Sequence, residues 1–178
     1  SDTNILEIEV PDELRKKVKS GMSFIDDALG GASKTTNKTI AGITPSTVVF
    51  FTGGPGSGKT TLMMQLADAV TGQGNIAVFN TNEQNLYQVK MVAERLRLKN
   101  GFICNGESSL PVLYKQFDAL KKQHPDKHLF YIQDSLQTLS DPRYPNDPTY
   151  SNGKTAERAL ASVASYAKAN YIIPFMIG

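Results

Sequence analysis

The segment 53–60 holds the residue types with the clearest capacity for chemistry, and it reads Gly-Gly-Pro-Gly-Ser-Gly-Lys-Thr. It matches the pattern G-x-x-x-x-G-K-[ST], and it lies between an apolar run at 48–51 and a helical pattern that begins at Thr60. Glycines let successive backbone N–H groups surround a phosphate, and the N-terminus of a helix adds partial positive charge. The segment therefore predicts a nucleoside triphosphate site rather than a glycine-rich turn with an incidental lysine.

Two side chains of this segment have specific predicted roles. We expect the Lys59 ammonium to neutralise β- and γ-phosphate oxygens, and the Thr60 hydroxyl to ligate Mg²⁺. The complete set of predicted nucleotide-binding residues is Gly53, Gly54, Pro55, Gly56, Ser57, Gly58, Lys59, Thr60 and Thr61.

Two carboxylates follow apolar runs that read as strands, and hydrolysis of a triphosphate needs groups that hold a metal and orient a water. Asp134 ends the strand that begins with the run 129–132. Many strands end in a capping Asp, but the combination with a phosphate-binding segment predicts a Walker-B carboxylate that holds Mg²⁺. Glu83 follows the run 76–79, and its position fits two roles equally. It could act as a general base for the water, or interact with the dipole of the next helix.

Apolar periodicity supplies the elements that must position these residues. Strands are predicted at 5–10, 48–51, 76–79, 102–104, 129–132 and 172–177. Helices are predicted at about 12–19, within 21–31, at 59–71, at about 85–98, around 110–120 and at about 154–169. The polar stretches 32–47 and 141–153 predict loops. Pro174 makes the last strand awkward for a central position in a sheet.

The alternation of strands and helices predicts an α/β fold, a mainly parallel sheet covered by helices on both faces. With 178 residues and 40% hydrophobic content, the chain is expected to form one domain over 1–178. Residues 1–19 would form an N-terminal strand and helix extension, and residues 20–178 the core.

Composition excludes several classes of site. The single cysteine, Cys104, rules out an intramolecular disulfide framework and a Cys-rich zinc ribbon, and with only two histidines no transition-metal site is expected. The net charge of +2 neither demands nor excludes a nucleic-acid partner. No apolar run approaches the length of about 18 residues that a membrane span requires, and no signal-peptide pattern opens the chain. A cytoplasmic protein without a membrane partner is the default expectation.

Four stretches of the chain resemble bacterial RadA (Sms) ATPases, in the order in which that family has them. Residues 82–96 resemble the segment after its second core strand, and Asp-Ser-Leu-Gln-Thr-Leu at 134–139 resembles its Walker-B extension. Residues 167–178 are similar to its last helix and strand. Residues 21–31 resemble the lead-in helix of RecA, RadA and KaiC-type proteins. The likeness covers about positions 20–178.

The resemblance implies a RecA-like P-loop ATPase core with ATP and Mg²⁺ as ligands, and a final strand inserted between the Walker-A and Walker-B strands. It implies that Lys59 and Thr60 bind phosphate and metal. It also implies that Asp134 holds the metal through water and that Glu83 is the catalytic glutamate, which activates the water. Finally, it implies a homo-oligomer, a ring or a filament, that uses ATP to act on DNA in recombination, repair or helicase-type processing.

The chain departs from that family at several places. Gln133 stands where an aliphatic residue is usual, so its amide needs a partner or access to water. Asn82 replaces the glycine that precedes the glutamate. The family's zinc ribbon is absent from this sequence, and the loops 32–44 and 141–153 are peculiar to it. Because the sequence ends at Gly178, before the family's sensor residue and DNA-contacting loops, we expect a core truncated at its C-terminus that hydrolyses ATP weakly alone.

Two other functions remain open from the sequence. A KaiC-like signalling or scaffold ATPase without DNA binding shares the lead-in helix and the phosphate-binding segment, although the match at 134–138 favours the RadA branch. A small-molecule kinase also carries Gly-Pro-Gly-Ser-Gly-Lys-Thr, but kinases of that kind have an arginine-rich lid, and no such cluster follows Asp134. A GTPase is disfavoured because no Asn-Lys-x-Asp motif is present.

Overall fold

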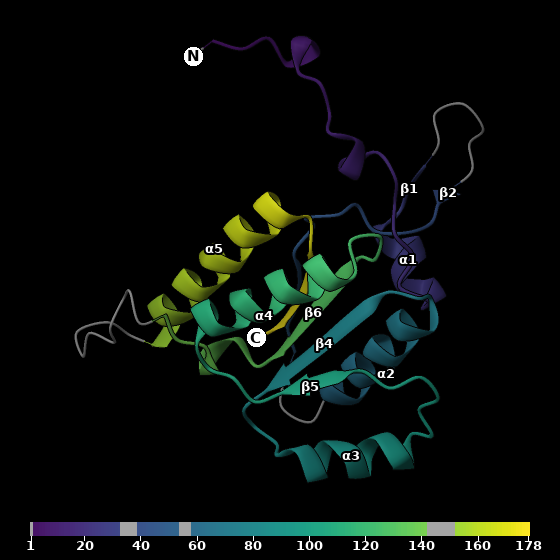
Figure 1. The fold of residues 1–178 in the computed structure, drawn as a ribbon, viewed down its shortest axis with the longest axis vertical. Helices are drawn as coiled ribbons and strands as arrows, with labels where there is room; N and C mark the ends of the chain where they lie inside the picture. Colours follow the sequence, from purple (N-terminus) through teal and green to yellow (C-terminus); the bar gives the residue numbers. More distant parts are fainter. Residues whose placement is uncertain (1, 33–38, 54–57, 142–151) are drawn as a thin grey trace.

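A five-stranded parallel sheet forms the centre of the protein (Figure 1). The computed structural model describes residues 2–32, 39–53, 58–141 and 152–178. The strands of the sheet, in spatial order, are β3 (Val49–Phe51), β7 (Ile173–Ile177), β6 (Leu129–Asp134), β4 (Ile76–Thr81) and β5 (Ile103–Asn105). The last strand of the chain thus lies between β3 and β6, as the family resemblance implied.

Helices cover both faces of this sheet. The α-helices of the described residues are α1 (Ser23–Leu29), α2 (Lys59–Gly72), α3 (Leu86–Arg95), α4 (Leu110–Gln123) and α5 (Asn152–Asn170). Buried residues of α1, α2 and α3 share one hydrophobic core with the sheet, and those of α4 and α5 share a second core on its other face. The predicted α/β architecture, a parallel sheet with helices on both faces, is confirmed.

Successive residues of the central strands belong to opposite cores. In β4, Ala77 and Phe79 pack with α2, whereas Ile76 and Val78 pack with the core of α4 and α5. Strand β6 follows the same period of two, and every residue of both strands is buried. A parallel strand covered on both faces reads as a continuous apolar run, which is why these two strands were visible in the sequence.

Pro174 occupies a central strand without breaking the ladder. The backbone oxygen of Ile172 accepts from Ser46 N at 3.1 Å, and Gly178 N donates to Phe51 O at 3.0 Å. Even-numbered residues of β7 therefore direct their backbone groups toward β3. Pairing between β3 and β7 starts with Val49 opposite Phe175. The N–H that Pro174 lacks would thus point at the chain just before β3 begins, where no ladder bond is needed.

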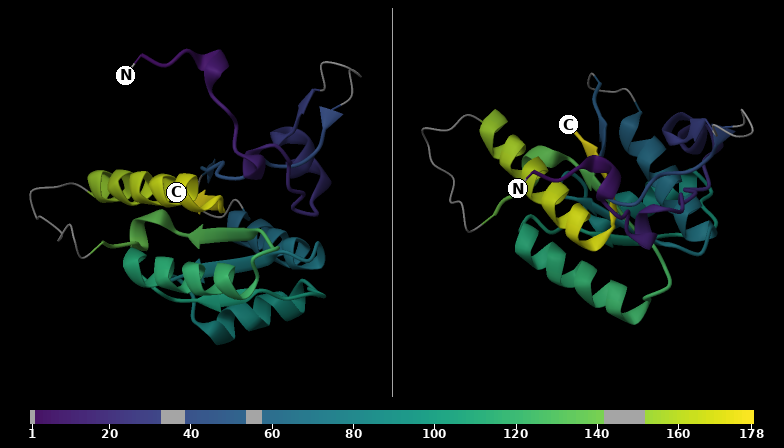
Figure 2. Two further views of the ribbon diagram at one scale, coloured as in Figure 1. Left: turned by 45° about the horizontal axis from the view of Figure 1, so that its top comes forward. Right: turned by 90° about the horizontal axis from the view of Figure 1, so that it is seen from above.

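The N-terminal prediction was wrong. Residues 5–10 form no strand, and instead a single 3-10 turn, η1 (Ile5–Glu7), begins where Asn4 Oδ1 accepts from Leu6 N at 3.0 Å. The segment extends away from the sheet (Figure 2), and its apolar side chains are exposed. A strand needs an edge with which to pair, and the described part of the chain places none beside this segment.

Residues 12–19 also differ from the prediction. Only a 3-10 turn forms, η2 (Asp12–Leu14), because Val18 and Ile43 exchange two backbone hydrogen bonds of 2.8 and 2.7 Å. An extended residue in a bridge cannot continue a helix. Two short antiparallel strands form where a loop was predicted at 32–47: β1 (Gly31–Ala32) overlaps its start, and β2 (Thr39–Ile40) lies within it.

Most other predicted boundaries differ from the observed ones by a few residues. Helix α3 ends at Arg95 rather than near 98, because Leu98 N turns back to bond Ala93 O and Arg97 has a left-handed φ of 54°. Helix α5 begins at Asn152, inside the predicted loop 141–153, most of which lies outside the described residues. Over the residues that the structure describes, no helix has the length and apolarity to cross a membrane.

Buried Asp26 fixes the segment that precedes helix α1. It is 4% exposed, and its two carboxylate oxygens accept from the backbone N–H groups of Ser20 at 2.9 Å and Gly21 at 3.2 Å. We predict that Asp26→Ala lowers the free energy of unfolding by about 1–3 kcal/mol, because two donors lose their acceptor. Denaturant titration measures this change. The exposed neighbour Asp27 is the matched control, and an equal loss on Asp27→Ala would contradict the prediction.

Candidate functional site

The predicted site residues converge at the carboxyl edge of the sheet. Asp134 is the last residue of β6, Glu83 follows β4 by two residues, and Gly178 follows β7 by one. Parallel strands end on the same side, so these positions share one edge with the segment after β3. Gly54, Pro55, Gly56 and Ser57, which belong to the predicted phosphate-binding segment, lie outside the described residues.

Lys59 lies between the ends of two strands. Its Nζ donates to Gly53 O at 2.8 Å and to Gly178 O at 3.4 Å, and these residues follow β3 and β7. Lys59 is the first residue of α2, and the preceding Gly58 has a φ of 76°, a left-handed value that favours glycine. The ammonium is therefore held at the N-terminus of α2, where partial positive charge also favours an anion. Thr61 follows in the first turn of α2 and is half-buried.

Thr60 contacts Asp134 directly. The Thr60 hydroxyl donates to Oδ2 of Asp134 at 2.8 Å, which joins the start of α2 to the end of β6. Burial raises the pKa of the Asp134 carboxyl above its usual value, and this rise is opposed by the Thr60 hydrogen bond. The nearby Glu83 carboxylate raises this pKa further, and the Lys59 charge lowers it. The other three predicted polar groups thus lie close enough to Asp134 to influence its pKa.

The Thr60–Asp134 pair has the donor chemistry that Mg²⁺ prefers. A hydroxyl and a carboxylate are hard oxygen ligands, and Mg²⁺ is commonly held by one or two side chains together with substrate phosphates and waters. Within the described ranges, no group of three or more His, Cys, Asp or Glu side chains is arranged to hold a metal. The residues fit a metal that a nucleotide shares, rather than a cage built by the protein alone.

Glu83 contacts the residue that follows Asp134. Ser135 Oγ donates to Glu83 Oε1 at 2.9 Å, and Glu83 N donates to Thr81 Oγ1 at 3.2 Å. The N-terminus of α3 is capped instead by Asn85 and Gln88, which exchange side-chain to backbone hydrogen bonds of 2.9 and 2.8 Å. Glu83 therefore bonds Ser135 and lies two residues before Asn85, the N-cap of α3.

Gln133 has the partners that its amide requires. It is fully buried, and its Oε1 accepts from Asn80 Nδ2 at 2.7 Å and from Tyr131 OH at 2.6 Å. Its Nε2 donates to Ser135 O at 3.0 Å and to Thr138 Oγ1 at 3.3 Å. Ser135 and Asn80 were not predicted as site residues, although Ser135 directly follows β6 and Asn80 lies near the carboxyl end of β4.

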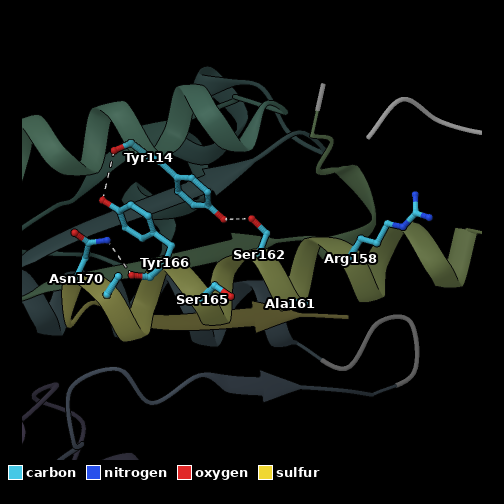
Figure 3. Close-up of a pocket in the computed structure, with 8 residues that line it drawn as sticks. Tyr114, Arg158, Ala161, Ser162, Ser165, Tyr166 and Asn170 are labelled. Carbon is cyan, nitrogen blue, oxygen red and sulfur yellow. Dashed lines mark hydrogen bonds between the residues drawn. The ribbon is translucent and has the colours of Figure 1, made fainter. Parts of the chain in front are cut away.

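A surface hollow between α4 and α5 is separate from these residues. Tyr114 and Tyr166 stack there with ring centroids 4.3 Å apart, and the Tyr114 hydroxyl bonds the Ser162 hydroxyl at 2.8 Å (Figure 3). Its lining contains none of the predicted nucleotide-binding residues. The two tyrosines join the helices that cover one face of the sheet.

The fold is that of RecA-like ATPase domains. Over 75% of this chain and 38% of the other, it superposes with a TM-score of 0.62 on a DnaB-like replicative helicase, at 12% identity. It also matches a second solved structure, described as an ATPase domain, with a TM-score of 0.59 at 12% identity, over 73% of this chain and 56% of that one. No protein-family model matches the chain.

In sequence, the chain is similar to proteins named DNA repair protein RadA. It is 27% identical to that of Listeria monocytogenes over 173 residues, which is 96% of this chain and 34% of the relative. It is 28% identical to that of Bacillus subtilis over 181 residues, 98% of this chain and 34% of the relative. The chain thus spans about one third of the length of these relatives.

The Gln133 contacts generate a stability prediction. The buried Tyr131 hydroxyl donates to Gln133 Oε1, and burial raises the pKa of Tyr131 above its ordinary value. Gln133→Leu removes the acceptor, and we expect a loss of about 1–3 kcal/mol for each buried group left unpaired. Adding Tyr131→Phe should recover part of that loss, because no hydroxyl then remains buried alone. Denaturant titration measures the free energy of unfolding of each single variant and of the double variant. A loss in the double variant equal to the sum of the two single losses would contradict this account.

Proposed function

We propose that this chain is the ATP-binding and ATP-hydrolysing core of a RadA-like protein that acts on DNA in recombination, repair or helicase-type processing. The observation that carries the proposal is the convergence of Lys59, the Thr60–Asp134 pair and Glu83 at one edge of a RecA-like sheet. The similarity to proteins named DNA repair protein RadA supports the DNA-directed part. The fold likeness to a replicative helicase agrees with it.

In this proposal, the phosphates of ATP lie at the N-terminus of α2. The Lys59 ammonium would exchange its carbonyl partners for β- and γ-phosphate oxygens and neutralise the charge that builds up on them. The Thr60 hydroxyl and the Asp134 carboxylate would hold Mg²⁺, Asp134 through water. Bound there, Mg²⁺ supplies positive charge that neutralises phosphate oxygens.

Glu83 would act on the attacking water. Its side chain is exposed, and one of its oxygens is held by Ser135, so the carboxylate can orient a water toward the γ-phosphate and accept its proton. Cleavage of the bond between the β-bridging oxygen and the γ-phosphorus would then yield ADP and inorganic phosphate. The residues that surround this step lie at the start of α2 or at and just beyond the carboxyl ends of β4 and β6.

Two substitutions separate binding from turnover. We predict that Lys59→Ala weakens ATP binding and abolishes measurable hydrolysis, because the phosphate charge loses its partner. Glu83→Gln should keep ATP affinity and lower turnover by about 10²–10⁴-fold, the contribution of a positioned base. Titration with a fluorescent ATP analogue and a phosphate-release assay measure the two quantities.

The exposed ion pair Lys90–Glu94, 3.8 Å apart on α3, provides matched controls. Lys90→Ala and Glu94→Gln remove the same groups from a surface helix, and both variants should bind and hydrolyse ATP as the wild type does. Equal loss of binding in Lys59→Ala and Glu83→Gln would show that Glu83 is structural and would contradict its assigned role.

The DNA-directed part of the proposal has its own test. We predict that single-stranded or branched DNA stimulates ATP hydrolysis by the full-length protein, and that the stimulation weakens as salt is raised, because phosphate contacts release counterions. The measurement is the steady-state rate with and without DNA over a series of salt concentrations. An intact ATPase without stimulation by any DNA at any salt would contradict this part and leave a signalling or scaffold ATPase.

A further inference from the structure

A continuous set of hydrogen bonds connects the buried amide of Gln133 with the exposed carboxylate of Glu83. Gln133 Nε2 donates to the backbone oxygen of Ser135 at 3.0 Å, and Ser135 Oγ donates to Glu83 Oε1 at 2.9 Å. Ser135 is 8% exposed, so its hydroxyl reaches the site from a packed position. Among the hydrogen bonds of this set, the one from the Ser135 hydroxyl is the bond that reaches the Glu83 carboxylate.

The backbone of Ser135 is held from several directions. Its carbonyl oxygen accepts from Gln133 Nε2, from the Thr138 hydroxyl at 2.7 Å and from Thr138 N at 3.2 Å. The last contact belongs to the 3-10 turn η3 (Leu136–Thr138), which follows β6. A carbonyl with three donors restrains the peptide plane that follows the Ser135 Cα, and so restrains the backbone from which its hydroxyl extends.

The other side of the contact is fixed as well. Asn80 in β4 donates to Gln133 and to Glu107 O at 2.8 Å, and its Oδ1 accepts from Glu107 N at 3.0 Å. Asn80 is fully buried, and it lies three residues before Glu83. The Asn80–Gln133 amide pair thus ties β4 to β6 immediately behind the Glu83–Ser135 contact. Glu83 and Ser135 both follow the strands that this amide pair joins.

We propose that Ser135 is a positioning residue for Glu83, and that the Asn80–Gln133 amide pair sets the place of its hydroxyl. This inference rests on the proposed function, because it takes Glu83 to serve the attacking water. An exposed glutamate samples several rotamers, and a donor that holds one oxygen reduces that freedom and leaves the second oxygen for the water. A carboxylate held before the reaction needs less reorganisation to reach the transition state.

The hydroxyl of Ser135 can be removed without disturbing the core. Its partner is an exposed carboxylate, whereas the structural bonds of this residue involve its carbonyl oxygen, which Ser135→Ala retains. A purely structural role therefore predicts no change in turnover. A positioning role predicts that kcat falls about tenfold in Ser135→Ala, the effect of one hydrogen bond to a charged group. ATP affinity and the thermal midpoint of the full-length protein should stay unchanged.

A double-mutant cycle tests whether Ser135 acts through Glu83. The rates of the wild type, Ser135→Ala, Glu83→Gln and the double variant are measured at saturating ATP and Mg²⁺. If Ser135 acts by holding Glu83, Ser135→Ala should add little to the loss already caused by Glu83→Gln. Ser140→Ala is the matched control, since the Ser140 hydroxyl lies in the same segment and contacts Ser108 O at 3.4 Å. It should leave kcat unchanged.

The role of the amide pair is tested with a second variant. Tyr131→Phe/Gln133→Leu removes the amide donor to the Ser135 carbonyl without leaving the Tyr131 hydroxyl unpaired. We expect the same fall of about tenfold in kcat, and no further fall when Ser135→Ala is added, because both changes release the same carboxylate. A normal kcat in the folded double variant would overturn the role of Gln133.

The outcomes separate this inference from the proposed function. An active wild type in which Ser135→Ala hydrolyses ATP at the normal rate, or faster, would overturn the positioning role alone. So would a tenfold loss that persists in the Glu83→Gln background, since Ser135 would then act elsewhere. A wild type without ATP hydrolysis would overturn both proposals.

Discussion

The order of the strands is the constraint on which the rest of the site depends. Because β7 lies between β3 and β6, the segment that follows β3 and the carboxylate that ends β6 are two strand spacings apart, about 10 Å. The first turn of α2 bridges this gap, since Thr60 contacts Asp134 and Lys59 contacts the ends of β3 and β7. The N-terminus of α2 is thereby held against the ends of β3, β6 and β7. The positions of Lys59 and Thr60 are therefore set by the sheet.

The polar core behind this edge is an uncommon choice for a central strand. Gln133 and Asn80 are both fully buried in the two central strands, and an amide without partners there would cost about 2–7 kcal/mol by transfer from water. Each amide instead has partners on neighbouring elements. Such a pair gives little net stability over two aliphatic residues, but it fixes directions that an apolar contact would leave free. The amide pair lies next to the carboxyl edge of the sheet, where ATP hydrolysis is proposed.

Much of this arrangement could be predicted from the sequence, because buried parallel strands and amphipathic helices leave strong periodic patterns. The runs at 76–79 and 129–132 showed the two central strands, and the segment 53–60 showed the helix start. The pattern at 5–10 misled, since alternation favours a strand only when an edge is present to pair with it. The contact between Gln133 and Asn80 could not be predicted, because residues so far apart in the sequence meet only after the chain has folded.

Pro174 has a consequence for the accuracy of the whole assembly. If β3 slid by two residues toward the start of β7, one of its carbonyl groups would face a ring nitrogen that carries no hydrogen. That slip would keep every side chain on its proper face, so hydrophobic patterning alone would not resist it. It would displace Gly53 by about 7 Å along the strand relative to Asp134. Pro174 therefore disfavours this shifted register of β3 and β7. It thereby favours the native distance between Gly53 and Asp134, which a bound triphosphate would have to match.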